Sequence, residues 1–191
     1  VRKLVAEGAK VRVVMTDSAK EFVSPLALQA VSGNKVSNSL LDEDAEAAMG
    51  HIELARWADI FVVAPATANT MAKLTHGLAD DLLTTLALAT AAPIAIAPAM
   101  NQQMWAAAAT SENLLKLQQR GVLQIGPASG EQACGDIGYG RMAEPQEIVS
   151  FVANYFASKI NVPSSLFAGK KIMITAGPTR EALDPVRYIS N

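Results

Sequence analysis

Two stretches, DIFVVAPATANT at residues 59–70 and PIAIAPAMN at residues 93–101, indicate the class of fold. Each contains a short apolar run, and a proline ends each run. Such runs are typical of strands that are buried on both faces of a sheet. The residues between them, 67–76 and 80–90, have the apolar spacing of helices. This strand–helix–strand order predicts parallel strands.

The same alternation of short apolar runs and helical segments continues on both sides of this unit. Residues 11–15 and 122–125 are predicted to form two further strands. Further helices are predicted at residues 1–8, 18–31, 43–57, 101–120 and 145–158. We therefore expect an α/β fold with a doubly wound, mostly parallel, Rossmann-like sheet.

Composition divides the chain into two unequal parts. Residues 1–158 form one predicted domain, and residues 159–168 are predicted to be a linker. Residues 169–191 open a second α/β unit with the strand-like run KKIMIT. The sequence starts at Val1, already inside a helical pattern. We therefore expect a fragment whose first domain lacks its N-terminal strand and whose second domain is incomplete.

The composition also limits the class of protein. Half of the 191 residues are hydrophobic, and the net charge is −2 with the two signs interspersed. This chain has no basic stripe for a nucleic-acid backbone and no apolar run of membrane-spanning length. One cysteine excludes an internal disulfide bond, and the two histidines lack the neighbours of a metal site. We expect a cytoplasmic protein with no metal, nucleic-acid or membrane partner.

Small or hydroxyl-bearing residues follow three of the predicted strands. In an open parallel sheet, ligands bind beyond the carboxyl ends of the strands. Each of these residues also suits an ordinary helix N-cap. Three such loops on one edge nevertheless favour a phosphate-bearing cofactor. The loops are MTDS at residues 15–18, APATANT at residues 64–70 and APAMN at residues 97–101.

Two single residues are candidates for chemistry. Cys134 lies in the glycine-rich segment GPASGEQACGDIGYGRM at residues 126–142, which we predict to be a loop rather than a helix or strand. A thiol there is either a small buried hydrophobe or a proton donor or nucleophile on a flap. His51 follows Gly50 at a turn into a predicted helix. It is either a cap or an acid–base group, and periodicity does not separate these interpretations.

Four motifs in order carry a resemblance to a known family. They are GHIEL (50–54), APATAN (64–69), PAMNQQMW (98–105) and ACGDIGYGRM (133–142). Together they resemble the phosphopantothenoylcysteine decarboxylase domain of the bacterial bifunctional coenzyme A biosynthesis flavoproteins, which have a flavodoxin-like fold. The tail, with ITAGPTRE (174–181) and DPVRYISN (184–191), resembles the opening of the phosphopantothenate–cysteine ligase domain.

The resemblance implies FMN as cofactor and 4′-phosphopantothenoylcysteine as substrate. Oxidation of the substrate's CH2–SH group to a thioaldehyde creates an electron sink for loss of CO2. Protonation of the resulting enethiolate and return of the hydride then yield 4′-phosphopantetheine.

The resemblance also implies roles for individual residues. Cys134 would protonate the enethiolate, His51 would be the base, and Asn101 would hold the substrate carboxylate. Ala133, Gly135 and Arg141 are further expected substrate contacts. The expected FMN contacts are Thr16, Ser18, Thr67, Asn69 and Met100.

Two further expectations concern the assembly and the missing parts of the family pattern. Family members form trimers or dodecamers with the site between subunits, so His51 is expected to act on a neighbour's FMN. The family's N-terminal strand and glycine-rich FMN loop are absent from this chain, which predicts poor FMN retention. The ligase uses Mg2+ and CTP, which the ligase residues in this chain are not expected to bind alone.

Three other functions are alternatives for this sequence. A flavin prenyltransferase of the same fold lacks the late cysteine segment. A non-catalytic flavoprotein regulator can lose catalytic residues, whereas His51, Asn101 and Cys134 are all present. A NAD-dependent dehydrogenase carries a G-x-G-x-x-G turn directly after a strand, and this chain has none. The decarboxylase is therefore the favoured hypothesis.

Overall fold

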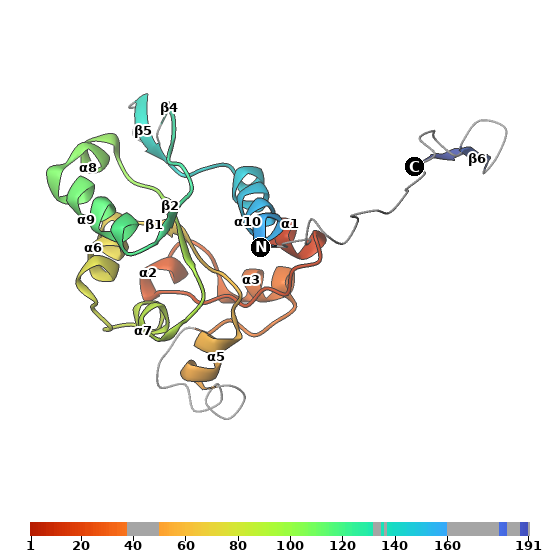
Figure 1. Ribbon diagram of the computed structural model, residues 1–191, viewed down its shortest axis with the longest axis horizontal. Helices are drawn as coiled ribbons and strands as arrows, with labels where there is room; N and C mark the ends of the chain where they lie inside the picture. The colour runs from red at the N-terminus through yellow and green to blue at the C-terminus, as the bar shows by residue number, and fades with distance from the viewer. Residues whose placement is uncertain (38–49, 132–134, 136, 160–179, 183–187, 191) are drawn as a thin grey trace, which may run out of the picture. The chain divides into compact units, whose positions relative to one another are not determined.

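A computed structural model describes residues 1–37, 50–131, 135, 137–159, 180–182 and 188–190. The chain divides into two compact units, Val1–Tyr155 and Phe156–Asn191. The first unit contains the sheet and the helices around it (Figure 1). Within the described part of the second unit, strands β6 (Arg180–Ala182) and β7 (Tyr188–Ser190) form an antiparallel pair. The predicted strand at 170–175 lies outside the described residues.

The main sheet has the order β1-β2-β3, and both of its strand pairs are parallel. The strands are β1 (Phe61–Ala66), β2 (Ile94–Pro98) and β3 (Leu123–Gln124). These positions confirm three of the four predicted strands and the parallel α/β class. The predicted strand at residues 11–15 is wrong as a sheet member, because Val14 forms only an isolated parallel bridge with Ser37. Two hydrogen bonds, from Met15 N to Ser37 O and from Ser37 N to Val13 O, hold that bridge.

Helices follow and separate the strands, as the sequence pattern predicts. The helices in the described residues are α1 (Arg2–Ala6), α2 (Asp17–Lys20), α3 (Pro25–Ser32), α5 (His51–Trp57), α6 (Ala68–His76), α7 (Leu82–Ala89), α8 (Gln102–Ala106), α9 (Ala108–Gln119) and α10 (Pro145–Lys159). The part of the predicted 43–57 helix that precedes Gly50 lies outside the described residues.

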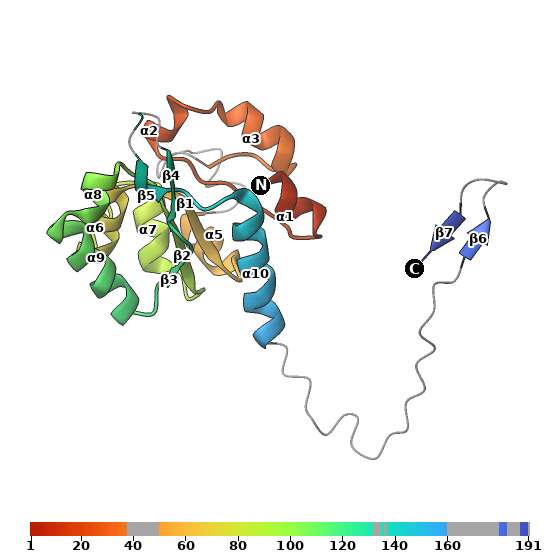
Figure 2. The ribbon, with the colours of Figure 1, turned by 90° about the horizontal axis from the view of Figure 1, so that it is seen from above.

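Both faces of β2 are buried, and alternate residues face different helices. Ile96 packs with Met71 of α6 and Leu117 of α9 in one core cluster. Ala95 and Ala97 belong to a second cluster, with Ile148 of α10. Figure 2 shows α6 and α9 on one side of the sheet and α10 on the other. This two-sided covering explains why the strands lack alternation of polar and apolar residues.

Two long predicted helices are each broken into two. Residues 18–31 form α2 and α3, because Ser24 caps α3 by accepting from Ala27 N at 3.1 Å and Pro25 occupies its first position. Residues 101–120 form α8 and α9, with Ala107 in an extended conformation between them. Neither break interrupts the apolar spacing, so periodicity alone does not reveal it.

The glycine-rich segment contains strands, which corrects the prediction of a loop. Strands β4 (Ala128–Glu131) and β5 (Ile137–Arg141) pair as an antiparallel hairpin, with Gly130 opposite Gly138. The prediction was wrong because glycine lowers strand propensity but leaves intact the backbone groups that pair strands.

We predict that Leu117→Ala lowers the free energy of unfolding by about 2–5 kcal/mol. Leu117 is 2% exposed and packs between α9 and the sheet, so truncation leaves a cavity. Leu115, two residues earlier on the same helix, is 56% exposed. Leu115→Ala should therefore change the same quantity by less than about 0.5 kcal/mol. Equal losses in urea titrations of the two variants would contradict this account of the core.

Candidate functional site

The carboxyl ends of β1 and β2 lie side by side. Ala66 pairs with Pro98, and the N–H of Ala99 donates to the carbonyl of Ala66 at 3.0 Å. Thr67 follows β1 directly, and Asn101 lies three residues beyond β2. Two of the three predicted ligand loops are therefore brought together at one edge of the sheet.

Thr67 begins α6 as its N-cap. Its Oγ1 accepts from the N–H of Thr70 at 3.2 Å and lies 3.0 Å from the Thr70 hydroxyl. Thr67 and Asn69 are exposed, and Thr70 is half-buried. The N-terminus of a nine-residue helix, with two hydroxyl groups beside it, is thus accessible at this edge. Such an end attracts anions through its backbone N–H groups and its dipole.

Asn101 begins α8 in the same way. Its Oδ1 accepts from the N–H of Gln103 at 2.8 Å, and both Asn101 and Met100 are half-buried. Because the helix holds Oδ1, the Nδ2 group of the planar amide is turned away from the helix end. The hydrogen bond thereby fixes the direction of the amide.

The β4–β5 hairpin also reaches this edge. The N–H of Met100 donates to the carbonyl of Gly140 in β5 at 2.9 Å. Arg141, an expected substrate contact, pairs with Glu144 at 2.5 Å and is half exposed. Gly135 is exposed and has a φ of 85°, a conformation that favours glycine. Ala133 and Cys134 lie outside the described residues.

Thr16 and Ser18, the expected FMN contacts of the first loop, lie at the start of α2. The Oγ1 of Thr16 accepts from the N–H of Ala19 at 3.2 Å, so Thr16 is the N-cap of this short helix. Thr16 is half-buried and Ser18 is exposed. All three candidate loops therefore contain a helix cap, as the simplest interpretation of their hydroxyl and amide groups predicts.

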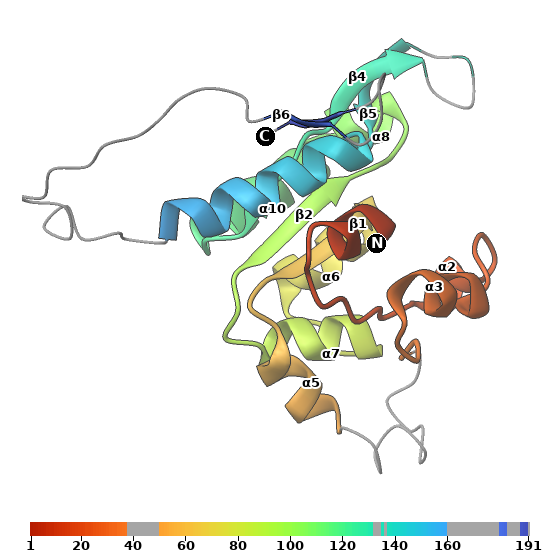
Figure 3. The same cartoon turned by 90° about the vertical axis from the view of Figure 1, so that its right-hand side faces the viewer.

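His51 is not brought next to Asn101. It is the first residue of α5, after the N-cap Gly50, which confirms the predicted turn into a helix. Figures 1 and 3 both place α5 at the opposite end of the unit from α8 and the hairpin. His51 is half-buried.

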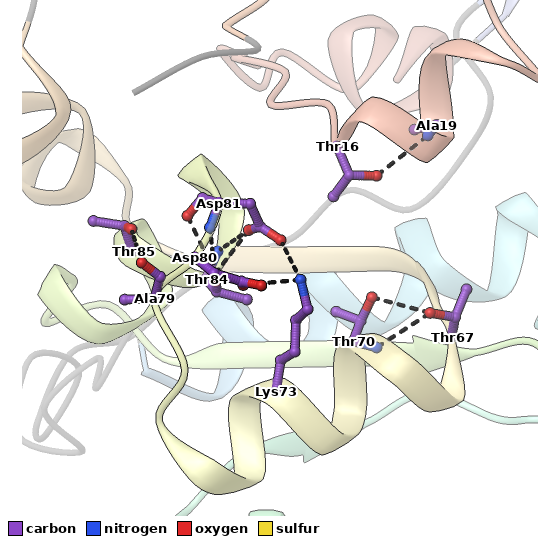
Figure 4. Close-up of polar contacts among 10 residues, drawn as sticks. All are labelled: Thr16, Ala19, Thr67, Thr70, Lys73, Ala79, Asp80, Asp81, Thr84 and Thr85. Atoms are coloured by element: carbon purple, nitrogen blue, oxygen red, sulfur yellow. Dashed lines mark hydrogen bonds and ion pairs between the residues drawn. The ribbon is translucent and has the colours of Figure 1, made fainter. Parts of the chain in front are cut away.

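A charged cluster that the sequence analysis did not identify joins α6 to α7. Figure 4 shows Lys73 reaching from α6 to two carboxylates, at 2.8 Å from Asp80 and 3.0 Å from Asp81. Asp81 is the N-cap of α7 and accepts from both the N–H and the hydroxyl of Thr84 at 2.8 Å. The order Asp-Leu-Leu-Thr at residues 81–84 could have indicated this helix start. A cap residue followed three positions later by a polar partner is typical of the start of a helix.

The charges of this cluster stabilise one another. Hydrogen bonds to Asp80 and then to Asp81 raise the pKa of Lys73. Burial of the Asp81 carboxyl works to raise its pKa, but hydrogen bonds from Thr84 and Lys73 outweigh burial and hold that pKa below its ordinary value. The cluster thus holds the start of α7 against α6, the helix that begins at Thr67.

The chain has the α/β fold of a flavoprotein. The family model described as "Flavoprotein" matches residues 1–157, and the chain belongs to this family. A second model, "DNA/pantothenate metabolism flavoprotein C-terminal domain", matches residues 167–191.

The chain is also similar in sequence to relatives of known name. The chain is 63% identical over 190 residues to the coenzyme A biosynthesis bifunctional protein CoaBC of Vibrio cholerae. That match covers 100% of this chain and 46% of the relative, so the chain spans about half the length of the curated relatives it matches.

Two solved structures share the fold. One is a cysteine-to-serine mutant of a PPC decarboxylase complexed with pantothenoylaminoethenethiol, with 38% identity and a TM-score of 0.70. The match covers 81% of this chain and 87% of that one. The other is the FMN binding protein AtHal3, with 39% identity, a TM-score of 0.68, and coverage of 82% and 86%.

Two features are absent from the described residues. No helix among them has the length and apolar character to cross a membrane. Within the same residues, no group of three or more His, Cys, Asp or Glu side chains is arranged to hold a metal ion.

We predict that Asp81→Asn reduces the loss of stability in acid. The folded pKa of Asp81 is below its unfolded value of about 3.9, so its contribution is full above that value and is lost as the pH falls through the folded pKa. Asparagine keeps the helix cap but carries no charge. Urea titrations between about pH 5 and pH 2 should show a steeper fall in the free energy of unfolding for the wild type. Parallel curves for the two proteins would refute the charged role of Asp81.

Proposed function

We propose that this chain carries out the FMN-dependent decarboxylation of 4′-phosphopantothenoylcysteine to 4′-phosphopantetheine, a step of coenzyme A biosynthesis. The observation that carries the proposal is the placement of Asn101. Its amide is oriented by α8 at the carboxyl edge of the sheet, beside the β4–β5 hairpin. A PPC decarboxylase with 38% identity has the same fold and holds a pantothenoyl compound in its solved structure.

The donor groups at this edge fit FMN. The N-terminus of α6 and the hydroxyls of Thr67 and Thr70 suit a phosphate or the ribityl hydroxyls. Asn69, Met100, Thr16 and Ser18 are the further proposed contacts. Bound FMN would accept the hydride when the substrate's CH2–SH group is oxidised to a thioaldehyde, and would give that hydride back after CO2 has left.

Three residues of the chain act on the substrate in this proposal. The Nδ2 group of Asn101 donates to the substrate carboxylate and orients it for loss of CO2. His51 acts as the base, in the role the family resemblance implies. The Cys134 thiol donates a proton to the enethiolate carbon that has lost CO2. Ala133, Gly135 and Arg141 contact the substrate beside it, which requires Arg141 to reach past its ion pair with Glu144.

The position of α5 supports a site shared between subunits. Because α5 lies away from α8 within one chain, the proposed base His51 serves the site of a neighbouring copy. This arrangement requires a homo-oligomer, a trimer or a dodecamer by family resemblance.

The remaining assignments follow the same family likeness. We propose that residues 1–158 are the decarboxylase domain, that 159–168 form a linker, and that 169–191 begin a ligase domain. The complete protein then also joins cysteine to 4′-phosphopantothenate with CTP and Mg2+, in the cytoplasm. The match of residues 167–191 to the second family model supports this division.

We predict that the flavin-loaded protein, in its full length, releases CO2 from 4′-phosphopantothenoylcysteine. Cys134→Ser should lose product formation while still releasing CO2, because the enethiolate accumulates without its proton donor. The measurement is CO2 release and product mass with flavin absorbance recorded. A flavin-loaded wild type without turnover would support the non-catalytic regulator instead. A fully active Cys134→Ser variant would return Cys134 to the role of a small buried hydrophobe.

A mixing experiment tests the shared site. We predict that His51→Asn and Asn101→Ala are each inactive alone, but that their co-expression restores about a quarter of wild-type activity, the fraction of sites in which one subunit supplies His51 and its neighbour supplies Asn101. Mixing His51→Asn with a His51→Asn, Asn101→Ala double variant is the control and should restore nothing. Absence of complementation in proven mixed oligomers would place both residues in the site of one chain.

A further inference from the structure

Strand β5 presents a face of glycine to α8. Ile137 and Tyr139 are 76% and 62% exposed, so they lie on the outer face of the strand. Successive residues of a strand alternate between its faces, which places Gly138 and Gly140 on the inner face, where Gly140 is buried. The hairpin therefore approaches α8 with its backbone rather than with side chains.

The side chain of Gln102 fills the space over Gly138. A Cβ atom added to Gly138 would overlap Gln102 Oε1 and would lie 3.0 Å from Gln102 Cβ and 3.1 Å from Gln102 Cδ. Real Cβ atoms are almost never so close to several atoms of one side chain. Gly138 does not have the left-handed backbone conformation of Gly126, Gly135 and Gly140. Glycine at this position therefore leaves room for the Gln102 side chain, and the backbone conformation does not require it.

The two residues that flank Asn101 in the sequence both contact the hairpin. Met100, the residue before it, donates its N–H to the carbonyl of Gly140 at 2.9 Å. The side chain of Gln102, the residue after it, packs on the backbone of Gly138. The residue proposed to hold the substrate carboxylate thus lies between the two contacts that fix β5.

We propose that Gln102 is a positioning residue, whose packing on Gly138 sets the place of the β4–β5 hairpin relative to the Asn101 amide. This inference rests on the proposed decarboxylase function and assigns Gln102 no contact with substrate or flavin. Displacement of a reacting group by about 1 Å can cost on the order of 100-fold in rate. A methyl group at position 138 drives the end of the Gln102 side chain away from β5, and Gln102 Cβ and Cδ must also yield by a few tenths of an ångström. The packing that sets the place of the hairpin beside Asn101 is then lost.

The test uses a suppressor pair and a matched control in the full-length, flavin-loaded protein. Gly138→Ala introduces the overlap, and Gln102→Ala removes the side chain that causes most of it. Gly130 lies opposite Gly138 in the same hairpin, and a Cβ there would meet its nearest atom, Arg141 Nη1, at 3.4 Å. Gly130→Ala is therefore the same chemical change without the overlap.

Gly138→Ala is expected to lower kcat by about 10- to 100-fold while the flavin content stays at the wild-type level. Gly130→Ala should stay within about 3-fold of the wild type, since it adds a methyl group without overlap. The double variant Gln102→Ala, Gly138→Ala should be at least about 5-fold more active than the product of the two single effects, because the methyl group enters the vacated space. Equality with that product would overturn the proposal, and so would a loss of flavin in parallel with kcat.

A second readout keeps this test separate from the proposed reaction. Arg141 lies in β5 and is half exposed, so trypsin cleavage after it reports release of the hairpin. Gly138→Ala should speed this cleavage several-fold, and the double variant should reverse much of the change. If the wild type fails to decarboxylate but cleavage follows this pattern, the function is wrong and the positioning contact stands. Unchanged cleavage in Gly138→Ala would overturn the contact, whatever the activity.

Discussion

The parallel pairing of β1 with β2, closed by the Ala99 N–H bond to the Ala66 carbonyl, is the constraint on which the candidate site depends. It forces the residues after both strands to leave the sheet at the same edge. Thr67 and Asn101 then each cap the helix that follows, so two helix N-termini lie at the same edge of the sheet. Burial of Ile96 on one face and of Ala95 and Ala97 on the other holds the pairing in register.

The β4–β5 hairpin adjoins the β1–β2 edge through contacts of its backbone. Its inner face has no side chains at Gly138 and Gly140, so its backbone lies directly on α8 and on the Met100 amide. Contacts through the backbone leave little room for adjustment, because interiors are closely packed. Gly138 and Gly140 therefore allow β5 to lie close to α8.

The sequence predicts the strands at 61–66 and 94–98 to within two residues at each end, because each contains a short apolar run next to a proline. Strand β1 nevertheless continues through Pro65 to Ala66. It predicts the ends of helices α2 and α8 poorly, since local breaks at Ser24 and Ala107 do not disturb apolar spacing. The β4–β5 hairpin was missed because its pairing depends on backbone groups that leave no trace in side-chain pattern. The separation of α5 from α8 is a property of the tertiary arrangement, which no local motif encodes.

We propose that FMN and substrate bind at the β1–β2 edge and that His51 comes from a neighbouring subunit. An experimental structure of the flavin-loaded oligomer with a stable substrate analogue tests this arrangement most directly. The account predicts density for the flavin beside Thr67 and Met100, with the analogue's acidic group on Asn101 and the partner subunit's His51 close to the flavin. Flavin bound elsewhere, or beside the His51 of the same chain, would contradict it.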